Sequence, residues 1–287
     1  MQLYILPFDH RATFIRDLFG YEEPLSEKQI SDVKNYKSII WEAFVQVYKK
    51  QKDRKSLGIL IDEQFGLKII RKAKKLGAVL AVAAEKSGQK VFDFEYGQKF
   101  GQRILKINPD YAKVLVRYNP KNKKDNKMQF RKLKKINDFC QKKKIGFLFE
   151  LLVPATEKIK NYDTKIRPLL TMKAIKEIRN FGIEPDIWKL EAMPKKSDWK
   201  NVIEAAKKGS KKDAKIIVLG RAGTKKQVKE WLKTASSFPE IIGFAIGRTI
   251  FFSPLQKYRE GKISRKQAIG LIAKDFSYFT DYWKKLT

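Results

Sequence analysis

The chain has 287 residues, of which 43% are hydrophobic and 12% aromatic, so it is long enough to bury one enzyme-sized core. Its only cysteine, Cys140, excludes a disulfide framework or a thiolate metal site within the chain. We expect a cytoplasmic protein without a signal peptide, because no basic leader precedes the apolar stretch Leu3 to Pro7. The longest apolar run, Ala78 to Ala84, is too short to span a bilayer.

The formal net charge of +32 invites an interpretation as a nucleic-acid-binding surface. Most of the excess lysine, however, is spread along polar helix faces, as in Arg71 to Lys75 and Gln141 to Lys144. That distribution favours a general lysine bias over a dedicated surface. A nucleic acid or another polyanion therefore remains the alternative partner, and the sequence leaves a homo-oligomer open.

Short β-branched or apolar runs alternate along the whole chain with segments of helical periodicity. The predicted strands are Leu3 to Phe8, Leu57 to Ile61, Ala78 to Ala84, Lys113 to Val116, Gly146 to Leu151, Asp186 to Leu190, Lys215 to Leu219 and Gly243 to Ile246. The predicted helices are Lys37 to Lys49, Lys68 to Leu76, Met128 to Gln141, Met172 to Asn180, Asn201 to Lys207, Lys225 to Thr234 and Ser264 to Lys285. Eight such units predict a single-domain α/β fold, a (β/α)8 TIM barrel over residues 1–287, and a doubly wound open sheet is the weaker alternative.

The chemistry of such barrels lies at the C-terminal ends of the strands. Lys189 on the sixth strand points into the barrel, as alternation along the strand requires. Burial and a nearby cation both destabilise an ammonium group, which is how a lysine becomes a nucleophilic amine, and Lys113 is a candidate for that cation. The alternative is a structural ion pair of Lys189 with Glu150 or Glu191.

Three carboxylates stand at other strand ends. Glu150 interrupts an apolar strand, and a buried carboxyl group must be paired or protonated, so it is a candidate for proton transfer or for neutralising a lysine. Glu85 closes the third strand and is a candidate acid or base, or a loop-capping residue. Asp9 follows the first strand, where it would orient a substrate hydroxyl or Lys189, or cap the loop.

The single histidine, His10, disfavours a zinc site, because such sites use several histidines or cysteines. We expect no cofactor and no metal, although the ligand types of Asp9, Asp62, Glu63 and Glu85 would suit magnesium. His10 is more consistent with a positioning group than with the essential base, and His10 and Arg11 are candidates for substrate binding.

Gly-Arg pairs follow the last two predicted strands, Gly220-Arg221 and Gly247-Arg248. Barrels often bind phosphate at these two loops, where glycine lets backbone N–H groups approach an anion and arginine supplies a bidentate donor. The segment Asn119 to Lys127 has loop composition and would either raise the local concentration of phosphate or be a solvated loop.

These strand ends resemble a known family nearly from end to end of the chain. The segments Phe8 to Arg11, Leu60 to Gly66, Glu85 to Gly88, Lys113 to Tyr118, Phe147 to Leu152 and Pro185 to Glu191 look like the 2-deoxy-5-keto-gluconate-6-phosphate aldolase type domain, which is related to the tagatose-1,6-bisphosphate aldolases. The resemblance implies a class I, Schiff-base aldolase that acts on a phosphorylated sugar in carbohydrate metabolism.

The resemblance also implies residue roles. Lys189 would form the Schiff base, Glu150 and Glu85 would act as acid and base, Lys113 would lie near the imine, Asp9 would orient the substrate and Arg248 would bind phosphate. The products would be dihydroxyacetone phosphate and an aldehyde. Two alternatives remain: a catalytically altered barrel that binds polyanions, and a different phosphosugar lyase or isomerase.

Overall fold

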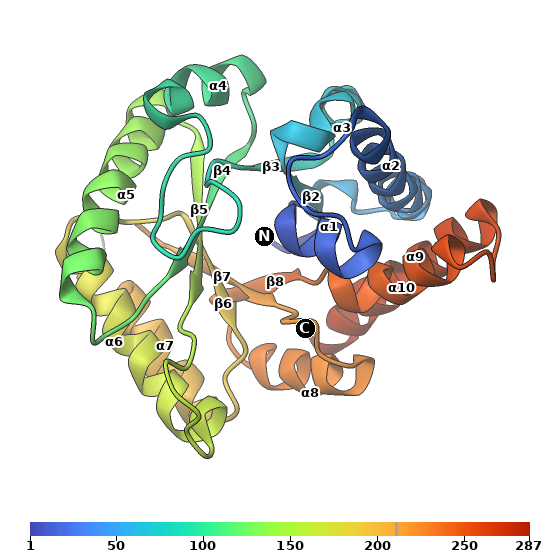
Figure 1. Cartoon of the computed structure of the whole chain (residues 1–287). Helices are drawn as coiled ribbons and strands as arrows, with labels where there is room; N and C mark the ends of the chain where they lie inside the picture. The colour runs from blue at the N-terminus through green and yellow to red at the C-terminus, as the bar shows by residue number, and fades with distance from the viewer. Residues whose placement is uncertain (210–211) are drawn as a thin grey trace.

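A computed structural model describes residues 1–209 and 212–287 of the chain. Eight parallel strands close into a barrel in sequence order, with β1 paired to β8 (Figure 1). The strands are β1 Leu3–Pro7, β2 Leu57–Ile61, β3 Val79–Ala83, β4 Tyr111–Arg117, β5 Gly146–Leu152, β6 Ile187–Glu191, β7 Lys215–Leu219 and β8 Ile241–Ala245. The prediction of a single eight-stranded TIM barrel is therefore confirmed.

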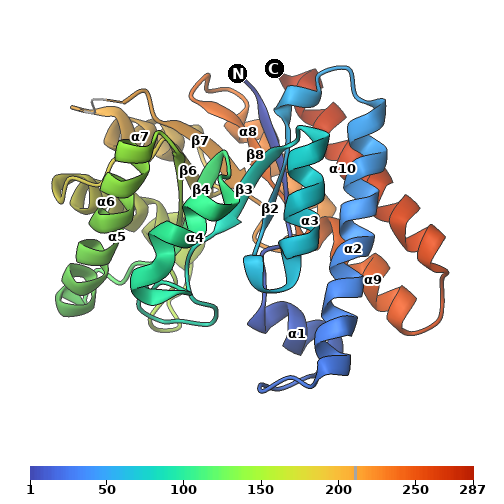
Figure 2. The same cartoon turned by 90° about the horizontal axis from the view of Figure 1, so that it is seen from above.

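Helices surround the strands (Figures 1 and 2). They are α1 Ala12–Phe19, α2 Glu27–Lys50, α3 Glu63–Leu76, α4 Phe100–Ile107, α5 Lys123–Lys143, α6 Arg167–Asn180, α7 Lys196–Lys207, α8 Lys225–Ala235, α9 Arg248–Arg259 and α10 Arg265–Leu286, with short helical turns at Arg54–Ser56, Gly97–Lys99 and Tyr162–Ile166. Capping boxes at Ser26, Thr224 and Ser264 start α2, α8 and α10 by pairing backbone N–H groups that a helix leaves free. None of the described helices has both the length and the apolar character needed to cross a membrane.

The barrel has two hydrophobic cores because side chains alternate along each strand. A large outer core lies between strands and helices. A small inner core fills the barrel below the C-terminal strand ends and consists of Leu3, Ile5, Leu60, Ala81, Leu148, Ile187, Ile217, Ile242 and Ala245. The chain ends meet at the opposite, N-terminal side of the barrel, where Trp283 Nε1 donates a hydrogen bond to Gln2 Oε1 at 2.8 Å (Figure 2).

The structure corrects one local expectation. Asn119 to Lys127 was expected to be a loop, but α5 already begins at Lys123. Asn122 caps this helix by accepting a hydrogen bond from Asp125 N at 3.0 Å, which allows a lysine-rich first turn. The helices α1, α4 and α9 were not predicted.

Candidate active site

Two adjoining cavities open at the C-terminal ends of the strands. One, of about 110 Å³, lies beside Asp9, Glu85 and Lys113. The other, of about 170 Å³, reaches Lys189 and the loops after β7 and β8. Both are lined by His10, Thr13, Leu115, Arg117 and Glu150, so together they form one site with Glu150 between its two halves.

The strand register brings the candidate catalytic groups together. Glu150 on β5 is the direct neighbour of Lys189 on β6, and both side chains point inward in the layer above Leu148 and Ile187. Lys113 enters from β4, one layer lower, where it pairs in register with Leu148. Strand register and side-chain alternation together therefore place a carboxylate between two inward-pointing lysines.

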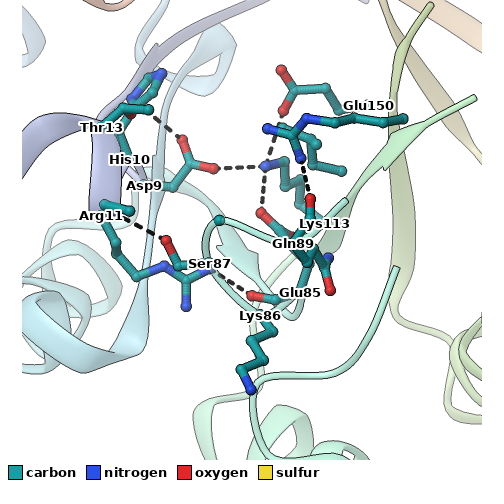
Figure 3. A pocket seen from close by; sticks show the side chains of 14 residues that line it. Asp9, His10, Arg11, Thr13, Glu85, Lys86, Ser87, Gln89, Lys113 and Glu150 are labelled. Atoms are coloured by element: carbon teal, nitrogen blue, oxygen red, sulfur yellow. Dashed lines mark hydrogen bonds and ion pairs between the residues drawn. The ribbon is translucent and has the colours of Figure 1, made fainter. Parts of the chain in front are cut away.

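Lys113 is the electrostatic centre of the site. Its Nζ lies 2.7 Å from Asp9 Oδ2, 2.7 Å from Glu85 Oε1 and 2.9 Å from Glu150 Oε2 (Figure 3). The second oxygen of Glu150, Oε1, lies 2.8 Å from Lys189 Nζ. All five side chains are buried, and two ammonium groups are shared among three carboxyl groups. Lys113 is thus a partner of carboxylates and not an isolated cation beside Lys189.

These contacts and burial shift the pKa values of the three carboxyl groups in different directions. Burial would raise the pKa of Asp9 and of Glu150, but Lys113 and Lys189 outweigh it, and both pKa values lie below the ordinary range. Burial prevails at Glu85 and raises its pKa despite the contact with Lys113. Among the residues that the structure describes, none forms a hydrogen bond with the buried Glu85 Oε2. Glu85 is therefore the carboxyl group that most readily keeps a proton, while Asp9 and Glu150 stay ionised.

His10 lines both cavities and stacks edge-on against Phe251, with ring centroids 6.3 Å apart. Burial lowers the pKa of the imidazole to about 4, although Asp9 opposes the shift. Its Nδ1 is buried and has no hydrogen-bond partner. A neutral imidazole has one donor and one acceptor nitrogen and lines both cavities, which fits the expected positioning role.

Arg11 lies beside the first cavity, but its terminal nitrogens are held by protein groups. Its guanidinium contacts Glu95 Oε2 at 2.6 Å and the carbonyl of Glu85 at 2.5 Å. The side chain thereby fastens the loop after β3, which also forms an antiparallel bridge between Glu85 and Phe94. Its geometry supports a role in holding Glu85, and the substrate contact expected for Arg11 stays a prediction.

The two Gly-Arg pairs lie at the second cavity, as expected from their strand ends. Gly247 is the N-cap residue of α9 and packs against the C-terminal end of β1. A Cβ atom at Gly247 would lie 2.4 Å from the carbonyl oxygen of Pro7. Arg248 follows and is 36% exposed, with Asp17 only at 3.8 Å. Arg221 is more engaged, because it contacts Asp163 at 2.6 Å and Glu191 at 3.1 Å. Gly220 and Gly247 thus flank an edge of the cavity at which Arg248 is less engaged by protein groups than Arg221.

The four carboxylates that would have suited magnesium are divided among different partners. Asp62 is paired with the buried Lys37, and Glu63 is paired with Arg103. Asp9 and Glu85 contact Lys113. Among the described residues, no group of three or more His, Cys, Asp or Glu side chains is placed to hold a metal ion.

Thr13, which lines the site, and Lys37, which lies behind it, were not identified from the sequence. Thr13 lines both cavities from the first turn of α1, a helix that sequence periodicity did not predict. Lys37 lies on α2 and reaches the loop after β1 from outside the barrel. The sequence offers no signal for Lys37, because a lysine in an amphipathic helix ordinarily faces solvent.

Solved structures with the same fold include a protein from Corynebacterium glutamicum, with 14% identity and a TM-score of 0.61 over 98% of this chain and 86% of that one. A Schiff base-forming fructose-1,6-bisphosphate aldolase has 14% identity and a TM-score of 0.59, covering 94% of this chain and 92% of its own. An archaeal fructose 1,6-bisphosphate aldolase has 14% identity and a TM-score of 0.58, covering 96% and 94%. At these identities the likeness concerns the fold.

No curated protein resembles the sequence closely enough to count as a match. The sequence pattern of one family, described as "Uncharacterized protein conserved in bacteria (DUF2090)", matches residues 1–287. The chain therefore belongs to this bacterial family.

Proposed function

We propose that the chain is a Schiff-base aldolase that cleaves a ketose phosphate to dihydroxyacetone phosphate and an aldehyde. The observation that carries the proposal is the buried Lys189 amine, which lines a cavity and lies 2.8 Å from Glu150. The likeness of the fold to a Schiff base-forming aldolase supports it. The first substrate to test is 2-deoxy-5-keto-gluconate 6-phosphate, which the sequence resemblance implies.

The first half of the reaction forms the imine. Glu150 takes a proton from Lys189, and the neutral amine adds to the substrate ketone to give a carbinolamine. Glu150 returns the proton to the carbinolamine hydroxyl, which leaves as water, and a protonated imine remains on Lys189. The lowered pKa keeps Glu150 in the ionised form that can act as a proton acceptor, and Lys113 stabilises its charge.

The second half breaks the carbon–carbon bond. The carboxylate of Glu150 accepts the proton of the hydroxyl beyond the scissile bond, and the bonding electrons move into the protonated imine to give an enamine. Glu85, which keeps its proton more readily, protonates the enamine carbon. Water then hydrolyses the protonated imine, releases dihydroxyacetone phosphate and leaves Lys189 as an ammonium group. The proton that Glu150 took from the substrate returns to Glu85, which restores the starting state of both carboxyl groups.

The phosphate would bind at the loops after β7 and β8. The first N–H groups of α9 have no partner within the helix and carry a partial positive charge, which suits an anion. Arg248 stands at this helix N-terminus and lines the cavity. The phosphate would then sit on the opposite side of Glu150 from Asp9 and Glu85.

The test is to reduce the imine with borohydride. Dihydroxyacetone phosphate and borohydride are added to the protein, and peptide mass spectrometry locates the added mass. We expect the adduct on Lys189, with Lys113 and Lys86 unmodified in the same sample, and no adduct in Lys189→Met. An adduct confined to other lysines, or turnover of the ketose phosphate by Lys189→Met, would refute the proposal.

A further inference from the structure

A third buried lysine, Lys37, lies behind the site and outside the proposed chemistry. Lys37 is on α2, and its side chain is completely buried together with that of Asp62, with which it forms an ion pair. Its Nζ also donates to the carbonyl of Phe8 at 2.8 Å and to the carbonyl of His10 at 3.1 Å. The three N–H donors of the ammonium group thus have three acceptors.

Fold stability alone does not account for this arrangement. Burying an ion pair costs so much desolvation that a well-packed apolar pair is often equally stable or more stable. The surroundings here are apolar, since the rings of Phe14 and Phe65 lie 5.7 and 5.6 Å from Nζ. A methionine would suit such surroundings, but it has no N–H group to direct at a carbonyl oxygen.

The two carbonyls flank Asp9 in the sequence, one residue before it and one after it. Lys37 therefore fixes the backbone on both sides of Asp9, while Asp62 holds Lys37 and also caps α3 by accepting a hydrogen bond from Phe65 N at 2.8 Å. On the other side, the carboxylate of Asp9 contacts Lys113 at 2.7 Å. A series of contacts thus connects Lys37 on α2 to the backbone around Asp9, the Asp9 carboxylate to Lys113, and Lys113 to Glu150.

We propose that Lys37 is a positioning residue of the active site, which holds the loop after β1 so that Asp9 faces Lys113 and His10 faces the cavity. The inference rests on the proposed function for its effect on turnover. The placement of the loop itself is independent of that function.

The test uses the double variant Lys37→Met/Asp62→Ser, because Lys37→Met alone leaves a buried carboxylate without a partner and threatens folding. Serine retains an N-cap acceptor for α3. The control is Lys74→Met on α3, which removes another lysine that donates to a backbone carbonyl, that of Ile107 at 2.6 Å, away from the two cavities.

We expect two effects in the double variant and neither in the control. Amide hydrogen exchange should become at least about tenfold faster in the peptide spanning residues 6–13, where Phe8 N donates to Leu60 O and Ala12 N to Ser87 Oγ, with unchanged exchange in α5. The kcat should fall by about 10- to 100-fold while KM changes less than about threefold, because a misplaced Asp9 affects the reacting geometry more than binding.

Unchanged exchange in this peptide would overturn the proposal, and so would faster exchange with a normal kcat. If the unaltered protein forms no imine with dihydroxyacetone phosphate, the proposed function fails, and the exchange measurement still decides whether Lys37 holds the loop.

Discussion

Glu150 and Lys189 are register neighbours on β5 and β6, with Oε1 of the carboxylate 2.8 Å from Nζ of the lysine. The other oxygen of Glu150 lies 2.9 Å from Lys113. Glu150 therefore contacts two lysines. One is Lys189, whose amine is proposed to react with the substrate, and the other is Lys113, which also pairs with Asp9 and Glu85. A change of charge at any of these five side chains alters the electrostatic energy of the others, because all five are buried.

Replacing Glu150 by glutamine should slow imine formation by about 100-fold or more, because the amide cannot take the proton of Lys189 or return it to the carbinolamine. The rate is measured by borohydride trapping at timed intervals after mixing with dihydroxyacetone phosphate. Glu157→Gln is the matched control, since Glu157 forms an exposed pair with Lys121. A normal trapping rate in Glu150→Gln would remove Glu150 from this step.

Lys113→Met should destabilise the fold by about 3–5 kcal/mol, because it leaves Asp9, Glu85 and Glu150 as buried carboxyl groups without their shared cation. Urea unfolding at neutral pH measures this loss. The loss should shrink as the pH falls and the carboxylates become protonated. Lys134→Met, which breaks an exposed pair with Asp138, should change stability by less than about 0.5 kcal/mol. Equal effects of the two variants would contradict the central role of Lys113.

The imidazole of His10 should titrate with a pKa of about 4, because burial disfavours its charged form. His10 is the only histidine, so its NMR signals are assigned without ambiguity. An unfolded histidine has a pKa near 6.5, so the folded state binds fewer protons between these values. Its contribution to stability is present above pH 6.5 and is lost as the pH falls toward 4.

The matching stability measurement compares the protein with His10→Gln by urea unfolding at pH 7 and pH 5. The histidine should account for a loss of about 2 kcal/mol between these two pH values, which the glutamine variant lacks. An NMR titration midpoint near 6.5 would contradict the buried, neutral imidazole.

Arg248→Ala should raise KM for a ketose phosphate by about tenfold or more, because a charge-assisted hydrogen bond to phosphate contributes about 1.5–3 kcal/mol. The KM for the corresponding unphosphorylated ketose should be unaffected. Lys257→Ala, near the other end of α9, is the control for charge on the same helix. An equal rise in KM for both ketoses would place the phosphate elsewhere.

The strands could be predicted from the sequence because each is a largely apolar run of five or seven residues, and side-chain alternation then shows which residues face inward. Lys189 and Glu150 became candidates on this ground, and the structure brings them within 2.8 Å. Their catalytic roles stay predictions. Alternation cannot give the register between strands, however, so the sequence did not indicate that Lys113 would meet three carboxylates at once.

Contacts made by residues outside the barrel could not be predicted from the sequence. Lys37 resembles any other lysine of an amphipathic helix, and only the placement of α2 against the loop after β1 buries it. The short helices α1 and α4 have eight residues each, too few for a persuasive periodic pattern. The cap at Asn122 depends on a contact with Asp125 within a segment whose composition is that of a loop.

The inner core of the barrel bears on the order in which the proposed products leave the site. Its nine apolar side chains fill the barrel below Lys113, and the two adjoining cavities open at the C-terminal ends of the strands. In the proposed reaction, substrate and both products pass through this end of the barrel, and the fragment bound through the imine stays tethered until hydrolysis. The proposed mechanism therefore predicts that the aldehyde leaves first and the phosphorylated ketone last, and that the reverse condensation requires the ketone to bind before the aldehyde.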